Sequence, residues 1–241
     1  MCGRYTLAKG EGRWEFAHIR VEWKGPGRFN IAPSQLAPII RFEDGKPVIR
    51  ELRWGLVPSW AKDAKIGNSL ANARADTVAT KPSFRTAFRR RRCLVPADGY
   101  YEWQTLGALK QPWRFVRPDR EPFLLAGLWE TWEDAGKTGE IRETFSLITT
   151  EPNAVTARVH DRMPVILSGE SAERWLADTA SPEKLLELLR PCPESELECY
   201  RVGAGVGNPR NDGPQCIEPL PGSVAVIAPP KPPEDPQGML F

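Results

Sequence analysis

A cysteine follows the initiator methionine, a position that allows a chemistry closed to any internal cysteine. Removal of Met1 would give Cys2 a free α-amine beside its thiol, and this 1,2-aminothiol can attack an aldehyde twice. The amine forms an imine first, and the sulfur then closes a five-membered thiazolidine ring. A structural cysteine is the common alternative, because cysteine is among the most buried residue types. The rest of the sequence has to decide between the two.

Four further segments place polar side chains beside apolar or aromatic neighbours. Asn72 and Arg74, two residues apart in ANARADT, would share one face of an extended chain. Glu102 stands among the aromatic residues of GYYEWQ, where loss of solvation would raise its pKa and suit it to proton transfer near neutral pH. His160 opens HDRMPVIL, ahead of an apolar strand, and the fourth segment is the polar loop NPRND at 208–212.

Each of these residues also has a purely structural interpretation. Asn72 could cap a turn, Glu102 could be a solvated strand residue, and His160 could be a hydrogen-bonded core histidine. Their coexistence with a cysteine at position 2 favours one catalytic group over four unrelated structural roles. The candidate catalytic residues are therefore Cys2, Asn72, Glu102 and His160.

Arginines and tryptophans near these residues form a second pattern. Arg4, Arg74 and Arg162 each lie within a few residues of a candidate catalytic group, and a guanidinium fork matches phosphate oxygens. Trp54 and Trp60 flank a proline-bent loop, WGLVPSW, and indole rings can stack on bases. Basic groups interleaved with aromatic rings favour a nucleic-acid substrate, single-stranded and read through its backbone.

The elements that must position these residues are mostly strands. Turn signals such as EDGKP and EDAGKTGE separate the strand-like runs, which predicts hairpins. The runs span residues 36–42, 48–54, 93–97, 99–104, 112–117, 123–132 and 144–150. Helical patterns are fewer and cover residues 10–19, 81–91, 168–179 and 181–190. Strands with scattered helices predict an α+β fold, with a mixed, β-barrel-like sheet core and flanking helices.

Composition limits the classes of protein to consider. The 241 residues carry a formal net charge of only +2, so nucleic-acid binding has to rest on local clusters. The longest apolar run, 123–129, is too short to span a membrane, and no signal peptide is apparent, so a cytoplasmic protein is expected. The five cysteines include no C-x-x-C pair, which supports neither a disulfide framework nor a metal site. No cofactor is expected either.

At this point seven motifs, in order, carry a resemblance to a known family. They are MCGRYT, NIAPSQ, WGLVPSWA, NARADT, CLVPADGYYEW, HDRMPVIL and VGNPRNDG. Together they resemble the SRAP family, the SOS response-associated peptidases or abasic-site processing proteins. The resemblance runs from Cys2 to about Pro219, and it implies a mixed β-barrel-like fold with flanking helices. It also implies a covalent link between the N-terminal cysteine and an abasic site in single-stranded DNA.

The resemblance assigns roles to the candidate residues. It implies that Cys2 is the nucleophile, that Asn72 holds its amine and the sugar, and that Glu102 is the acid and base for imine formation. It further implies that His160 assists opening of the sugar ring and reversal. The DNA-binding residues it implies are Arg4, Asn30, Trp54, Trp60, Arg74 and Arg162. Because an amide-blocked Cys2 cannot close a thiazolidine, the chemistry requires removal of Met1, for which autoproteolysis by the same thiol is one route.

Two other classes of function remain open. A class II glutamine amidotransferase also begins Met-Cys-Gly and uses an N-terminal cysteine, as an amidohydrolase. That family expects an apolar residue after the glycine, whereas Arg4 stands there. A non-catalytic single-stranded-DNA-binding module, with a structural Cys2, would bind intact and abasic strands equally and form no adduct that survives denaturation.

The end of the chain differs in composition from the rest. We expect an SRAP catalytic domain over residues 2–220 and a proline-rich, disordered tail over residues 221–241, in a monomeric, nucleoid-associated protein. Gln237, Leu240 and Phe241 are spaced as in the Q-x-x-L-F peptide that docks on the bacterial sliding clamp. The proline-rich stretch before them would hold this motif clear of the domain. A frayed terminus without a partner is the alternative, since short motifs often match by chance.

Overall fold

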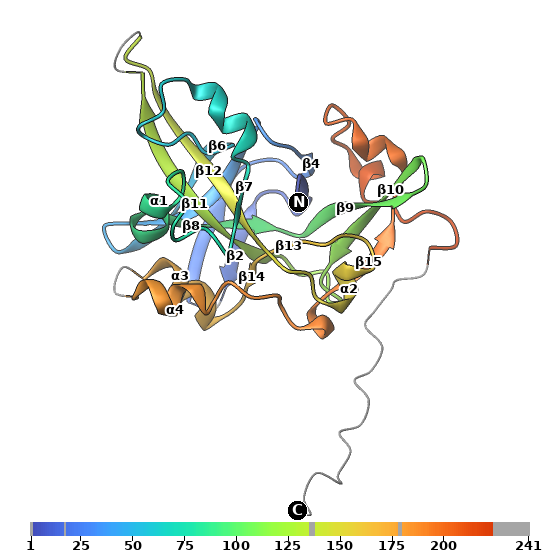
Figure 1. The fold of residues 1–241 in the computed structure, drawn as a ribbon. Helices are drawn as coiled ribbons and strands as arrows, with labels where there is room; N and C mark the ends of the chain where they lie inside the picture. Colours follow the sequence, from blue (N-terminus) through green and yellow to red (C-terminus); the bar gives the residue numbers. More distant parts are fainter. Residues whose placement is uncertain (1, 17, 135–137, 178–179, 224–241) are drawn as a thin grey trace, which may run out of the picture.

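The computed structural model describes residues 2–16, 18–134, 138–177 and 180–223 (Figure 1). Its strands are β1 Arg4–Leu7, β2 Gly12–Phe16, β3 Ile19–Trp23, β4 Arg28–Ile31, β5 Leu36–Glu43, β6 Lys46–Trp54, β7 Asn72–Arg74, β8 Arg92–Ala97, β9 Gly99–Leu106, β10 Leu109–Val116, β11 Phe123–Glu133, β12 Ile141–Thr150, β13 Met163–Pro164, β14 Ile166–Leu167 and β15 Glu198–Arg201. Its α-helices are α1 Arg85–Arg90, α2 Ala154–Ala157, α3 Glu170–Leu176 and α4 Pro182–Leu186. Short 3-10 segments include η1 Ala64–Ser69 and η3 Ala204–Gly207.

A closed barrel forms the larger part of the core. Strand β11 pairs with β8 on one side and with β12 on the other, and β12, β6, β5 and β8 complete the ring. The pairings are antiparallel except for β12 with β6, which is parallel. Apolar side chains fill the interior, where Trp54 stacks on Phe145 with ring centroids 6.1 Å apart. This arrangement confirms the predicted α+β fold with a barrel-like core.

A second sheet carries the start of the chain. Its strand order is β15, β10, β9, β1 and β4, and its neighbours are antiparallel. Strand β1 lies between β9 and β4, with Arg4 opposite Tyr101 and Tyr5 opposite Ile31. Because β8 continues into β9 through Asp98 alone, the barrel and the second sheet share one nearly continuous run of chain.

The helix predicted over residues 10–19 is wrong. Gly12–Phe16 and Ile19–Trp23 instead form the antiparallel hairpin β2–β3. Trp14 stacks on Trp23 across the hairpin with ring centroids 6.0 Å apart, and buried and exposed residues alternate along β3. Cross-strand aromatic packing outweighs the weak helical spacing of a segment that contains glycine, a poor helix former.

Short helices cover the outside of the barrel, as predicted for the three later segments. Helix α1 is shorter than the predicted segment 81–91, because residues 82–84 form a turn and the helix begins only at Arg85. The last residue of the RRRR run, Arg92, is buried and donates to the carbonyls of Phe88, Arg89, Trp175 and Ala177. This side chain therefore joins the ends of α1 and α3, and only part of the basic run faces solvent.

The predicted tail, 221–241, falls almost wholly outside the described residues. Up to Ser223 the chain follows β15: the amide of Leu220 donates to the carbonyl of Arg201, and the Arg201 amide donates to Ser223 Oγ. Gln237, Leu240 and Phe241 lie beyond the described part. Among the described residues, the helices are too short to cross a membrane.

Candidate active site

Cys2 lies buried at the start of the second sheet. Its exposed fraction is 0%, and its Sγ donates to the carbonyl of Arg4 at 3.8 Å. Asn72 Nδ2 donates to the Cys2 carbonyl at 2.9 Å. Asn72 reaches this position because β7 adds to β12 in parallel, with Asn72 opposite Leu147. The strand that opens the chain is therefore tied to the barrel at the cysteine itself.

Burial controls the reactivity of the Cys2 sulfur. Loss of solvation, followed by the nearby charge of Glu102, raises the pKa of the Cys2 thiol well above its usual range. A protonated thiol is a poor nucleophile, because the thiolate is the reactive form. A group that accepts the thiol proton as the sulfur reacts is thus a chemical requirement of this site.

Glu102 supplies a buried carboxyl group next to Cys2. It lies on β9 opposite Trp113 of β10, and the pairing of Arg4 with Tyr101 brings the start of β1 alongside it. Its exposed fraction is 2%. Burial raises the pKa of Glu102 to about 7, and the charge of Asp161 acts in the same direction. Such a carboxyl group is populated in both protonation states at neutral pH, which suits it to giving and taking a proton.

His160 faces Glu102 from the other side. Its Nε2 lies 3.7 Å from Glu102 Oε2. The backbone amide of Arg162 donates to His160 Nδ1 at 3.0 Å, while Asp161 Oδ1 lies 3.0 Å from the same nitrogen. Only one of these can be a hydrogen bond through Nδ1, and because a backbone amide can only donate, its position favours an unprotonated Nδ1 over a bond to the exposed Asp161 carboxylate. Burial also lowers the pKa of His160, so the neutral ring presents Nε2–H toward Glu102.

A short helix and the side chains of Tyr100 and Gln104 position the segment that bears His160. Helix α2 is capped by Asn153, whose side chain accepts from the Thr156 amide, and the His160 amide donates to the Thr156 carbonyl. Tyr100 of β9 shares a buried 2.9 Å hydrogen bond with Thr156 Oγ1. Gln104, two residues beyond Glu102, donates to the Arg158 carbonyl at 3.0 Å. Strand β9 therefore carries Glu102 and also positions the segment that bears His160.

Arg74 and Arg162 share an acidic neighbour. Arg74 Nε lies 3.1 Å from both Asp76 carboxylate oxygens, and its Nη2 lies 2.5 Å from Oδ2. Arg162 Nη2 donates to the Thr149 carbonyl at 2.6 Å, and its Nη1 lies 4.0 Å from Asp76 Oδ2. Thr149 pairs with Arg74 across β12 and β7. The two arginines thus converge at one edge of the barrel with Asp76 between them.

Arg4 and Asn30 hydrogen-bond to a loop instead of forming part of an open surface. Arg4 donates to Asn30 Oδ1 at 3.1 Å and to the Val206 carbonyl at 2.8 Å. Asn30 is fully buried, and its Nδ2 donates to the carbonyls of Val206, Asn208 and Asn211. The NPRND loop is thereby fixed against β4, so this structure gives both side chains a clear structural role beside the binding role predicted for them.

The two tryptophans of WGLVPSW have opposite environments. Trp54 is 1% exposed, packs between Tyr5 and Phe145, and donates through Nε1 to the Ala71 carbonyl. Neither face of its indole is open to a base, so the predicted stacking role of Trp54 is not supported by this structure. Trp60 is 58% exposed. Of the two, Trp60 is the ring that a partner can reach.

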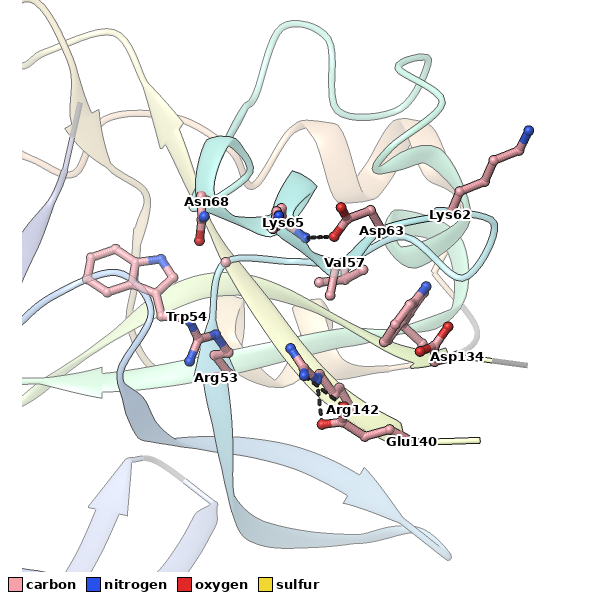
Figure 2. Close-up of a pocket in the computed structure, with 14 residues that line it drawn as sticks. Arg53, Trp54, Val57, Lys62, Asp63, Lys65, Asn68, Asp134, Glu140 and Arg142 are labelled. Atoms are coloured by element: carbon pink, nitrogen blue, oxygen red, sulfur yellow. Dashed lines mark hydrogen bonds and ion pairs between the residues drawn. The ribbon is translucent and has the colours of Figure 1, made fainter. Parts of the chain in front are cut away.

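A cavity of about 280 Å³ lies apart from these residues, between η1 with its preceding loop and the end of the β11–β12 hairpin (Figure 2). Four basic and three acidic residues line it: Arg53, Lys62, Lys65 and Arg142, with Asp63, Asp134 and Glu140. Glu140 binds the Arg142 guanidinium, and Asp63 accepts from the Lys65 amide. Of the candidate catalytic and DNA-binding residues, all of which lie in the described part of the chain, only Trp54 contributes to its lining.

Sequence reasoning missed several residues of this site. Asp76 stands two positions after Arg74, a spacing that by itself signals a side-chain pair. Tyr100 and Thr156 are separated by 56 positions, and Asp212 binds the backbone amides of Phe29 and Asn30 from the far end of the chain. No local sequence pattern predicts the contacts of Tyr100 and Asp212, because these contacts depend on how distant strands pair.

The comparisons with known proteins agree with the resemblance drawn from the motifs. A family model described as SOS response associated peptidase (SRAP) matches residues 1–209. The chain belongs to this family.

Its relatives include proteins of bacteria and vertebrates. The abasic site processing protein YoqW of Bacillus subtilis is 38% identical over 90% of this chain and 99% of its own length. The abasic site processing protein HMCES of Gallus gallus is 30% identical over 91% of this chain and 78% of its own length. A crystal structure of a protein from Bacteroides thetaiotaomicron has a TM-score of 0.73 and 33% identity, covering 79% of this chain and 84% of its own.

Proposed function

We propose that this protein processes abasic sites in single-stranded DNA by forming a covalent crosslink through Cys2. The observation that carries the proposal is the buried Glu102 carboxyl, which has its pKa raised to about 7 and lies beside both Cys2 and His160. The relatives are named abasic site processing proteins, which gives the class of substrate. Cys2 and Asn72 are joined by a hydrogen bond, which supports a role for Asn72 in orienting the nucleophile.

The reaction starts from a neutral Cys2 amine and a protonated Glu102. His160 gives its Nε2 proton to the ring oxygen of the abasic sugar and takes up the proton of the C1 hydroxyl, so the sugar opens to an aldehyde. The Cys2 amine adds to the aldehyde carbon, a proton shifts from its nitrogen to the oxygen, and Glu102 protonates the resulting hydroxyl, so water leaves and a protonated imine forms. The sulfur then adds to the same carbon as its proton passes to the Glu102 carboxylate, which closes the thiazolidine. Acid–base groups of this kind contribute about 10²–10⁴-fold to rate.

Release of Met1 comes before this chemistry. The Cys2 nitrogen of the encoded chain is part of a peptide bond, and an amide nitrogen does not form an imine. In this proposal the thiol of Cys2 attacks the Met1 carbonyl, the Met1–Cys2 amide bond breaks as the Cys2 nitrogen takes up a proton, and water hydrolyses the resulting thioester to release methionine. Such an autoproteolytic step would account for the word peptidase in the name of the family. In this proposal each molecule acts once as a thiol autopeptidase on its own Met1. It then acts on DNA as a crosslinking, lyase-like protein.

The DNA strand would run past Cys2 along basic and aromatic side chains. Arg74 and Arg162 lie together at the edge of the barrel and bind phosphates in this proposal, with Arg4 and Asn30 supporting the channel through the 206–211 loop. Trp60 provides an exposed ring for a base. In this proposal the protein works as a monomer in the cytoplasm, on DNA of the nucleoid.

The decisive experiment is a denaturing gel of the purified protein mixed with single-stranded DNA that carries one abasic site. A shifted band that survives heat and denaturant supports the proposal. A non-catalytic binding module would give no such band and equal affinity for intact and abasic strands. Release of ammonia from free glutamine, without a shifted band, would point instead to an amidotransferase-type activity.

Trp54 and Trp60 should respond differently to substitution by alanine. Trp60→Ala should leave the melting temperature unchanged and weaken binding of an intact single strand by about 1–3 kcal/mol, because one stacking contact is lost. Trp54→Ala should cost about 3–5 kcal/mol of folding stability, because it empties a core position. Thermal melts and fluorescence titrations measure the two effects. Unchanged DNA affinity in Trp60→Ala would remove the stacking role.

We also propose that the C-terminal residues Gln237, Leu240 and Phe241 bind a bacterial sliding clamp. Leu240 and Phe241 would fill an apolar pocket while Gln237 hydrogen-bonds to its rim. The proposal rests on the sequence motif alone. Titration of purified clamp should show binding to the full chain and none to a Leu240→Ala/Phe241→Ala variant. Equal affinity for both, or no binding by either, would contradict it.

A further inference from the structure

A carboxylate stands between the two arginines assigned to phosphate binding. Asp76 is bound side-on by Arg74 through Nε and Nη2, and its Oδ2 lies 4.0 Å from Arg162 Nη1. These are the contacts that a phosphate group would make with the same guanidinium groups. Burial and, after it, the like charge of Arg74 lower the pKa of Arg162, and the charge of Asp76 acts in the opposite direction.

We propose that Asp76 is a specificity-determining residue that occupies the phosphate site of Arg74 and Arg162 in the free protein and is displaced by the DNA backbone. The proposal rests on the DNA-binding function proposed above. It assigns Asp76 the task of weakening reversible binding to every strand, so that only a strand that reacts with Cys2 is retained.

The local structure allows the Asp76 carboxylate to move while its backbone stays fixed. The turn is pinned by hydrogen bonds from the Ala75 amide to Thr149 and from the Thr77 amide to Arg74. The Asp76 side chain is 47% exposed, so water can solvate the carboxylate once a phosphate replaces it. The arrangement therefore has two states that differ in one side chain.

Arg162 retains hydrogen-bonding capacity for the incoming group. One of its nitrogens is spent on the Thr149 carbonyl, which fixes the guanidinium in place. Its Nε is buried and lacks a hydrogen-bond partner among the described residues. The distance of 4.0 Å from Nη1 to Asp76 Oδ2 is the longest that still counts as an ion pair. A phosphate at the position of the Asp76 carboxylate would bind Arg74, which Asp76 then no longer holds, and Arg162, which is already oriented by Thr149.

The test compares Asp76→Asn with the wild type and with Asp119→Asn. Asp119 is a matched control, because it binds Arg117 with the same spacing and geometry, is 49% exposed and lies outside the site. Both variants change the net charge equally. Binding of an intact thymidine oligonucleotide, which cannot crosslink, is measured by fluorescence anisotropy over a range of salt concentrations.

Asp76→Asn should bind the intact strand about three- to fivefold more tightly at low salt, and Asp119→Asn should match the wild type. The salt slope of Asp76→Asn should be steeper by up to about 0.7, because a phosphate is then neutralised by two uncompensated arginines. Intact competitor strand should also slow crosslinking of an abasic strand more in Asp76→Asn. The gain in affinity should vanish when Arg74→Gln is added.

Other outcomes separate this proposal from the function on which it rests. If the wild type binds the intact strand and Asp76→Asn binds equally or more weakly, Asp76 merely orients Arg74 and the proposal fails, while DNA binding stands. A gain of the same size in Asp119→Asn would be a bulk charge effect and would also overturn it. If wild type and variants all fail to bind single strands, the proposed function itself fails.

Discussion

Cys2→Ser is expected to abolish the heat-stable adduct with an abasic single strand altogether. The variant lacks the thiol that would release Met1 in the proposed autoproteolysis, so a methionine aminopeptidase is used to remove Met1 from it. The serine α-amine can then still form an imine, but a hydroxyl group does not close the stable sulfur ring. Borohydride should therefore trap an adduct of the variant, and no adduct should survive denaturation without it. The amine is competent because its ordinary pKa of about 7.7–8.0 leaves a neutral fraction near pH 7.5.

Two controls make this result interpretable. Mass spectrometry of the variant shows whether Met1 has been removed, since a retained methionine would block the amine as well. Cys216→Ser is the matched control, because Cys216 is also buried and its Sγ donates to the Asn211 carbonyl, a bond that a hydroxyl can keep. An equally stable adduct from Cys2→Ser without reductant would refute thiazolidine formation.

Glu102→Gln should slow crosslinking by about 10²–10⁴-fold, the usual contribution of a general acid and base. The wild-type rate should change with pH around 7, where Glu102 titrates, and the rate of the variant should lose that dependence. Single-turnover gels at a series of pH values measure both. Glu130→Gln is the control, because Glu130 is a buried carboxylate that pairs with Arg91 at 2.6 Å outside the site. Its rate should match the wild type.

Glu102→Gln should make the folded protein more stable than the wild type at high pH. The pKa of Glu102 is raised from 4.5 to about 7 in the folded protein, so the folded state binds the proton more tightly than the unfolded state. Wild-type stability should therefore fall as pH rises from about 4.5 to about 7, by up to about 3 kcal/mol, relative to Glu102→Gln. Urea denaturation of both proteins at pH 5 and pH 8 gives the difference. An unchanged gap between them at the two pH values would mean that Glu102 has an ordinary pKa.

Local sequence was enough to predict the barrel strands and the place of Glu102 on a strand. Its neighbours Tyr101 and Trp103 point to the opposite face of β9, where their rings pack together, so the cause of its burial was not predicted correctly. Strands β1, β4 and β15 of the second sheet were not predicted. The seven predicted runs carry their own turn signals, and they correspond to the five strands of the barrel and to β9 and β10. These features need no knowledge of distant contacts.

Other roles could not be predicted, because they depend on distant pairing. Trp54 resembles an exposed ring in sequence, yet Phe145 and Tyr5 enclose it. Arg4 looks like a free cation, yet its partners at Val206 and Gly207 lie 202 and 203 positions away. The spacing of Asn72 and Arg74 correctly indicates one extended segment, while the pairing of that segment with β12, which delivers Asn72 to Cys2, is a property of the sheet.

The loop that Arg4 and Asn30 hold has a consequence for the timing of biosynthesis. The first strand of the chain is paired with β9, and its Arg4 donates to the carbonyl groups of Val206 and Gly207, which the ribosome makes about 200 residues later. A nascent chain therefore carries its cysteine long before the pocket around that cysteine exists. During this interval an uncovered aminothiol would react with any cellular aldehyde. Keeping Met1 in place until the last loop has docked would protect Cys2 throughout synthesis, so that each folded molecule would start with an unreacted cysteine.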